Sequence, residues 1–164
     1  MARWVEALLE IKAASGQLVT FRREGARFSQ DFTVKLCVDQ TYNLTLRLEP
    51  ACKLIAWRIG GQDSLTFKPA DHKTKGGHSH TDSADYTAAW STQEYRITSP
   101  GQRHDLVMDL ELEGGKLVRT STQVKFYDQK MAASRLGKPV HAITFTCDVS
   151  PGQPCVTARR GSIL

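Results

Sequence analysis

Apolar and polar residues alternate with a period of two along most of this chain. The stretch FTVKLCV at residues 32–38 places four apolar side chains on one parity and a threonine, a lysine and a cysteine on the other. Successive side chains of a β-strand point to opposite faces, so this pattern predicts a strand with one buried face. Residues 5–11 suit a helix as well as a strand, because Ala, Leu and Glu favour helices, and both readings stay open. The same alternation recurs at residues 42–48, 106–112, 118–126 and 143–149.

The turns between these segments indicate the fold class. Signals such as Gly60-Gly61, Pro100-Gly101 and Gly114-Gly115 separate about nine or ten short strands. No strand–helix–strand rhythm is visible, which argues against a nucleotide-binding parallel sheet. With 164 residues, 40% of them apolar, the chain suffices for one domain with a substantial core. We predict an all-β, single-domain antiparallel β-sandwich or barrel over 1–164, with a polar loop at 69–85 and a basic tail at 150–164.

Composition bounds the compartment and the partners. No apolar run approaches the ~18 residues of a membrane-spanning helix, and the start of the chain does not resemble a signal peptide. Four cysteines without Cys-x-x-Cys spacing are typical of reduced thiols. These features predict a cytoplasmic protein. Residues 116–164 hold eight Lys or Arg against two Asp, which would suit an acidic partner or an anionic membrane surface, but a solvated surface that happens to be basic is the preferred interpretation.

Motifs for catalysis and for nucleic-acid binding are missing from the sequence. There is no glycine-rich phosphate loop, nucleophile elbow or His-Glu-x-x-His, so we expect neither an enzyme nor a cofactor. An RNA-binding sheet needs aromatic and basic side chains on one face. Here Phe126 shares the apolar parity of Val124, whereas Lys125 and Tyr127 point the other way, so no nucleic-acid partner is expected.

Two short segments offer binding chemistry. His72, His78 and His80 lie in the polar loop, and His78 and His80 support an alternative function as a small-ligand or metal-binding β-sandwich module. We nevertheless predict a solvated loop without metal, because nothing in the sequence fixes a coordination geometry. The end of the chain, Ser162-Ile163-Leu164, matches the pattern that PDZ domains take up as an added strand.

The order and spacing of several motifs give a family resemblance. GARFSQDFTVKL at 25–36, WRIGG at 57–61, YTAAWST at 86–92, TQVKFY at 122–127 and ITFTCD at 143–148 resemble the cannabinoid receptor-interacting protein 1 family. The resemblance extends from about residue 8 to residue 148 and includes a Ser-x-Leu ending. It implies a small cytosolic, non-enzymatic protein that binds the cytoplasmic C-terminal tail of a G-protein-coupled receptor and modulates its G-protein signalling. It also implies a fold similar to the RhoGDI-type immunoglobulin-like domains that shelter lipid groups.

These implications lead to a hypothesis for the binding residues. An apolar interior that opens at one end would accept the acyl or prenyl chain of a lipidated G protein or other cargo; a closed core is the alternative. Arg27 would stand at the mouth, and Tyr86 and Trp90 would form a groove wall. We expect a monomer, in contact with the inner face of the plasma membrane. The hypothesised interior consists of Phe28, Phe32, Val34, Leu36, Tyr42, Leu44, Trp57, Ile59, Tyr86, Trp90, Val124, Phe126, Ile143 and Phe145.

Overall fold

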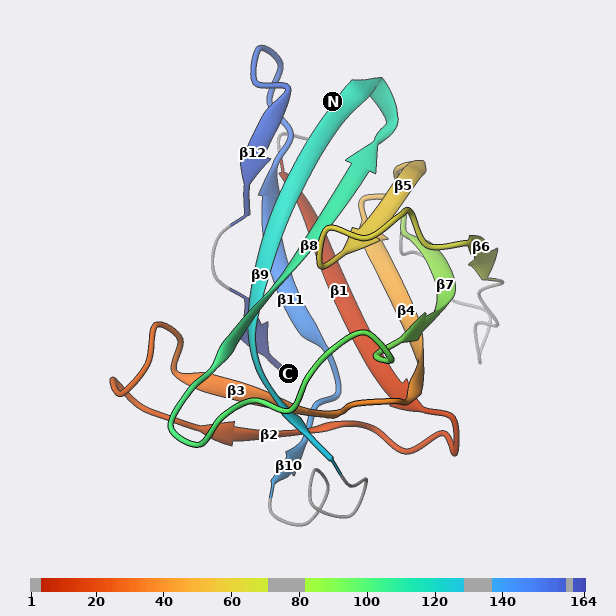
Figure 1. Ribbon diagram of the computed structural model, residues 1–164. Coiled ribbons are helices and arrows are strands. Elements are labelled where there is room, and N and C mark those ends of the chain that lie inside the picture. Colours follow the sequence, from red (N-terminus) through yellow and green to blue (C-terminus); the bar gives the residue numbers. More distant parts are fainter. Residues whose placement is uncertain (1–3, 71–81, 129–136, 159–160) are drawn as a thin grey trace.

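The computed structural model describes residues 4–70, 82–128, 137–158 and 161–164, which fold into two packed β-sheets (Figure 1). The six-stranded sheet has the order β13-β11-β1-β4-β7-β6, and the other has the order β10-β2-β3-β9-β8-β5 with β12 added beside β9. The first sheet contains β1 (Trp4–Ala13), β4 (Thr41–Glu49), β6 (Phe67–Ala70), β7 (Ala84–Ser91), β11 (Ile143–Asp148) and β13 (Ser162–Ile163). The second contains β2 (Thr20–Arg23), β3 (Phe32–Cys37), β5 (Leu54–Ile59), β8 (His104–Leu112), β9 (Lys116–Tyr127), β10 (Lys138–Pro139) and β12 (Cys155–Thr157).

The predicted all-β sandwich is confirmed, and the segment at 5–11 is a strand. β1 pairs antiparallel with β11 on one side and with β4 on the other, and its inward residues are Val5, Ala7, Leu9 and Ile11. These four side chains are at most 5% exposed. Residues two apart would point to different sides of a helix, so only a strand buries all four against one core.

The inner faces of both sheets contribute to one hydrophobic cluster. Its largest fully buried side chains include Trp57, Trp90, Phe32, Phe126 and Phe145, drawn from five strands of the two sheets. Alternation explains this arrangement, because every second residue of each strand faces the space between the sheets. In the part of the chain that the structure describes, no helix is long and apolar enough to cross a membrane.

The pairing of β9 departs from an antiparallel plan. β8 forms an antiparallel hairpin with one edge of β9 through the short 3₁₀ turn η1 (Glu113–Gly115). Two parallel strands share the other edge: β12 pairs with residues 117–119, and β3 pairs with residues 124–127. All six residues of β3 are buried, including those on the parity that faces away from the core, and β2 and β9 occupy its two edges.

Two predicted boundaries are wrong. Pro69 and Ala70 belong to β6, and β7 begins at Ala84, so strand pairing extends into the predicted loop from both sides. The predicted tail beyond the last strand itself contains strands β12 and β13. The strand residues in the predicted loop and tail form short runs without clear alternation. Their pairing depends on partners elsewhere in the sequence, which a local pattern does not reveal.

Candidate functional site

Thirteen of the hypothesised interior residues lie together in the core, each at most 8% exposed. They are Phe32, Val34, Leu36, Tyr42, Leu44, Trp57, Ile59, Tyr86, Trp90, Val124, Phe126, Ile143 and Phe145. Their own side chains fill the space between the sheets, as in the closed-core alternative. Whether any of them contacts a ligand stays a prediction.

Tyr86 and Trp90, hypothesised as a groove wall, also lie inside the sandwich. The Tyr86 hydroxyl donates to the Cys52 carbonyl at 3.0 Å and accepts from the Leu54 N–H at 3.2 Å. It therefore ties β7 to the start of β5. The Trp90 ring meets the ring of Tyr95 edge-on, with 5.8 Å between centroids. Burial of both side chains means that they stabilise the junction of the two sheets.

Arg27 and Phe28 lie outside the core. Arg27 is exposed and Phe28 is half-buried on the segment between β2 and β3. The Arg103 guanidinium carbon is 4.3 Å from the centre of the Phe28 ring, and that of Arg27 is 5.1 Å from it. Cations over an aromatic face are attracted by its negative charge density. The expectation that Phe28 lines the interior is wrong, because parity does not apply to a residue between strands.

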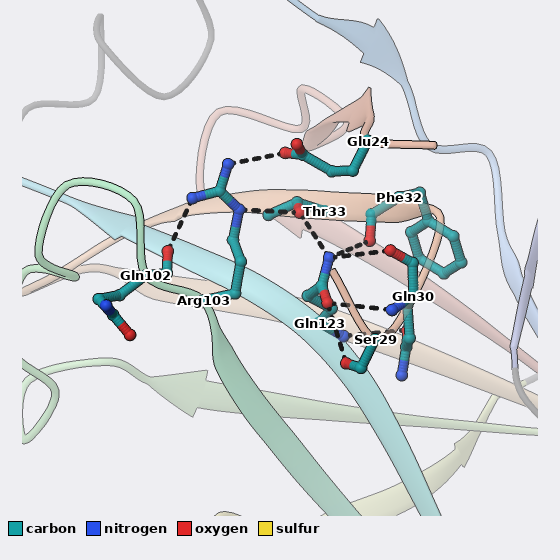
Figure 2. A network of polar contacts seen from close by, with 8 residues as sticks. All are labelled: Glu24, Ser29, Gln30, Phe32, Thr33, Gln102, Arg103 and Gln123. Carbon is teal, nitrogen blue, oxygen red and sulfur yellow. Dashed lines mark hydrogen bonds and ion pairs between the residues drawn. The ribbon is translucent and has the colours of Figure 1, made fainter. Parts of the chain in front are cut away.

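Arg103 holds this segment against the sheet through a buried ion pair (Figure 2). Its Nη2 donates to Glu24 Oε1 at 2.8 Å, its Nε donates to Thr33 Oγ1 at 3.1 Å and its Nη1 donates to the Gln102 carbonyl at 2.7 Å. The Arg103 and Glu24 side chains are only 8% and 2% exposed. Burial raises the pKa of Glu24, but the hydrogen bond and charge of Arg103 outweigh it, and the pKa is lowered overall.

A reciprocal glutamine pair completes the same network (Figure 2). Buried Gln123 accepts at Oε1 from the Ser29 hydroxyl and the Gln30 N–H, and its Nε2 faces the carbonyls of Gln30 and Phe32. The Gln30 side chain accepts from the Gln123 N–H and donates to the Ser121 carbonyl. Those backbone groups lie on the stretch of β9 between its pairings with β12 and β3. The Gln30 side chain thus provides hydrogen-bond partners for backbone groups of β9 that no neighbouring strand pairs with.

An open pocket lies at the end of the sandwich where β4 leads into β5 and where the β8–β9 hairpin turns. It is a pocket of ≈ 910 Å³. Val5, Leu112 and Val149 form its apolar floor, and Asp82 and Glu113 are its carboxylates. The Lys116 ammonium donates to the Ser150 carbonyl at 2.8 Å and to the Gln153 carbonyl, which fastens the 150–153 segment across one side. The remaining lining residues are Pro50, Ala51, Cys52, Gly114, Pro151, Gly152 and Pro154.

Two thiols belong to this end of the molecule. Burial, with a smaller contribution from Glu113, raises the pKa of Cys52 to about 11. Burial and the neighbouring Cys52 raise the pKa of Cys147 to about 12. Both thiols therefore stay protonated at neutral pH, and Cys52 contributes a small, weakly polar surface to the pocket.

Comparison with known proteins places the chain in a family. The family model described as CB1 cannabinoid receptor-interacting protein 1 matches residues 3–162, nearly the whole chain. The chain belongs to the CB1 cannabinoid receptor-interacting protein 1 family. Proteins of that name from Homo sapiens, Bos taurus and Mus musculus are each 24% identical to it over 148 residues, covering 89% of this chain and 87% of the relative. The family is named for interaction with a receptor and not for a reaction.

Sequence reasoning missed the pocket of this family member and the network around Arg103. The pocket is lined mainly by residues 50–52, 112–116 and 149–154, which lie at turns where no alternation marks an inward position. Arg103 and Glu24 are 79 residues apart and meet only in the folded chain. The sequence held one weak signal for this network, the Arg27-Phe28 pair. A charged residue next to an aromatic one can indicate a cation stacked on a ring.

Two segments that offered binding chemistry in the sequence remain to be placed. His72, His78 and His80 lie outside the described residues, and the residues that are described contain no group of three or more metal-ligating side chains. The Ser162–Leu164 segment pairs with β11: the Leu164 N–H donates to the Ala142 carbonyl, and the His141 N–H donates to the Leu164 carbonyl. Docking to a PDZ domain stays a prediction, and it requires release of these backbone groups.

Proposed function

We propose that this family member is a non-enzymatic cytoplasmic adaptor that binds the cytoplasmic C-terminal tail of a G-protein-coupled receptor and modulates its G-protein signalling. It acts as a monomer at the inner face of the plasma membrane. Its pocket shelters a lipid group of acylated or prenylated cargo, in the manner of a RhoGDI-like domain. The names of the curated relatives support the receptor as partner.

The pocket is the observation that carries the lipid part of the proposal. Its ≈ 910 Å³ lies within the roughly 300–1,000 Å³ typical of small-molecule sites. Val5 and Leu112 at its floor are continuous with the core, so an acyl chain that enters there loses contact with water on most of its sides. Burial of each CH₂ is worth about 0.8 kcal/mol, so ten methylenes give roughly 8 kcal/mol before ordering costs.

The lipid proposal is tested by calorimetric titration with one peptide in two forms, N-myristoylated and unmodified. We expect the myristoylated form to bind and the unmodified form to bind at least tenfold more weakly. Val149→Arg places a charge at the pocket floor and is expected to abolish the difference. Val107→Arg is the matched control, because Val107 is equally half-buried but points away from the core on β8.

A second pocket variant keeps the lipid test valid if Val149→Arg does not fold. Ala51 is exposed at the pocket rim, so Ala51→Trp occupies the opening without removing a core side chain. Equal binding of both peptide forms, or full lipid binding by Ala51→Trp, contradicts the lipid-sheltering role. The receptor part is tested separately by titrating the C-terminal tail peptide of the human type-1 cannabinoid receptor, and absence of binding there contradicts the adaptor role.

A further inference from the structure

Three basic side chains gather on the outer face of the second sheet, far from the pocket. Lys35 on β3 stands directly beside Lys125 of β9 in the parallel register. Arg22 of β2 is opposite Thr33, two residues from Lys35 on the same face, and is its diagonal neighbour. Lys116 lines the pocket and Lys125 belongs to this cluster, and both are on β9, so the two sites are roughly 30 Å apart at about 3.3 Å per residue.

Lys35 is the unusual member of this basic cluster (Arg22, Lys35 and Lys125). It is 6% exposed, yet its ammonium has no hydrogen-bond or ion-pair partner among the residues that the structure describes. Burial lowers its pKa, and so do the charges of Arg22 and Lys125; Glu24 acts in the opposite direction. Glu24 is already bound to Arg103 at 2.8 Å, so it does not neutralise the cluster. The Lys35 Nζ is not one of the fully buried side-chain atoms without a partner, so the ammonium reaches solvent beside two like charges, and an anion bound there would be favourable.

The open geometry points to an anion presented by a larger molecule. Arg22 is exposed, Lys125 is half-buried and the Lys35 side chain is covered except near its Nζ, so an anion would meet the cluster at its surface and not in an enclosed cavity. Small ligands need enclosure on most sides, whereas a charged group at the tip of a partner's side chain does not. Lys125 Nζ also lies over the Tyr127 ring, 5.2 Å from its centre, and this contact helps to hold the ammonium at the cluster.

We propose that the cluster of Arg22, Lys35 and Lys125 binds the phosphate monoester of a phosphorylated serine or threonine on a protein partner. A phosphate monoester brings close to two negative charges and three acceptor oxygens, which matches three cations better than one carboxylate does. A membrane headgroup fits less well, since no exposed large apolar side chain among the described residues lies on β2, β3 or residues 124–127 to enter a bilayer. Those exposed side chains are Trp4, Ile55, Ile97, Leu117 and Leu164.

The test uses the full chain labelled with ¹⁵N and an acetylated, amidated alanine pentapeptide with one central phosphoserine. We expect amide shifts centred on Arg22, Lys35 and Lys125, and binding at least tenfold weaker when the peptide carries serine or glutamate instead. Lys35→Met is expected to weaken binding about tenfold or more, the loss of one charge-assisted hydrogen bond. Lys12→Met on β1 is the matched control and leaves binding unchanged.

Other outcomes separate this site from its alternatives. If Lys35→Met does not fold, Lys125→Met, at a half-buried position, takes its place with the same expected loss. Equal binding of the phosphoserine and serine peptides overturns the proposal. So does Lys35-dependent sedimentation with phosphatidylcholine vesicles containing phosphatidylinositol 4-phosphate when the peptide causes no shifts, because the site then recognises a membrane. The pocket variant Val149→Arg is expected to keep phosphoserine binding. Failure of the lipid proposal can therefore be distinguished from failure of the phosphoserine proposal.

Discussion

Neutralising Glu24 by Glu24→Gln tests the buried ion pair with Arg103. The substitution keeps the shape of the side chain but leaves the Arg103 guanidinium, whose side chain is 8% exposed, without a counter-charge. Removal of one partner from a buried pair costs about 3–5 kcal/mol. Because glutamine can still accept a hydrogen bond from Arg103, we expect a loss near 3 kcal/mol in the free energy of unfolding.

A surface pair on the same segment supplies the control. Arg23 Nη1 and Asp31 Oδ2 are 3.4 Å apart, and the two side chains are 60% and 67% exposed. Exposed pairs contribute about 0–1 kcal/mol, so Asp31→Asn should change stability by less than 1 kcal/mol. The double variant Glu24→Gln with Arg103→Met removes both buried charges and should recover part of the loss.

Urea unfolding followed by tryptophan fluorescence measures these differences. With an m-value of about 1–3 kcal/mol per molar, the Glu24→Gln midpoint should fall by roughly 1–3 M at constant m. The folded pKa of Glu24 lies below the unfolded value of 4.5, so its contribution is complete above pH 4.5 and disappears as the pH falls through the folded pKa. The wild-type and Glu24→Gln curves should therefore converge in acid. A loss below 1 kcal/mol at pH 7, equal to that of Asp31→Asn, would refute the reasoning.

Three further outcomes are expected. Lys35→Met should raise the melting temperature at pH 7, and the gain should shrink towards pH 10.5, because the lowered folded pKa of Lys35 lets the native protein lose its proton first; an unchanged gain contradicts this. Gln123→Leu should cost at least about 3 kcal/mol in urea unfolding, since it leaves several buried backbone groups unpaired, whereas Gln93→Leu at an exposed position should cost almost nothing. Iodoacetamide at pH 8 should alkylate exposed Cys155 well before half-buried Cys52, whose pKa is about 11, as followed by peptide mass spectrometry; equal rates would argue against the raised pKa of Cys52.

The interior could be predicted from the sequence because a strand has a simple period. Val34 and Leu36, or Val124 and Phe126, are two residues apart, and knowing that one faces the core fixes the other. The same rule fails for Phe28, which lies between strands and stacks on Arg103. It also fails for Lys35, whose parity correctly indicates the outer face but whose burial depends on neighbours from β2 and β9.

The pocket and the polar network could not be predicted for a different reason. Pro50, Leu112 and Val149 come together only after three separate strand pairings set the positions of their turns. Gln30 and Gln123 are 93 residues apart, and neither residue type marks a buried position in a sequence. Such contacts depend on tertiary structure and leave no local pattern.

The central place of β9 has a consequence for how the chain reaches its native state. Both of its parallel partners are distant in sequence, and Thr33 meets Gln123 across 90 residues. A ribosome must release most of the polypeptide before β3 finds its neighbour, and closure of so long a loop is slow. The newly made amino-terminal half can pair β3 with β2, but it exposes the other edge of β3 until β9 is made, and we expect chaperones to bind at that edge during synthesis.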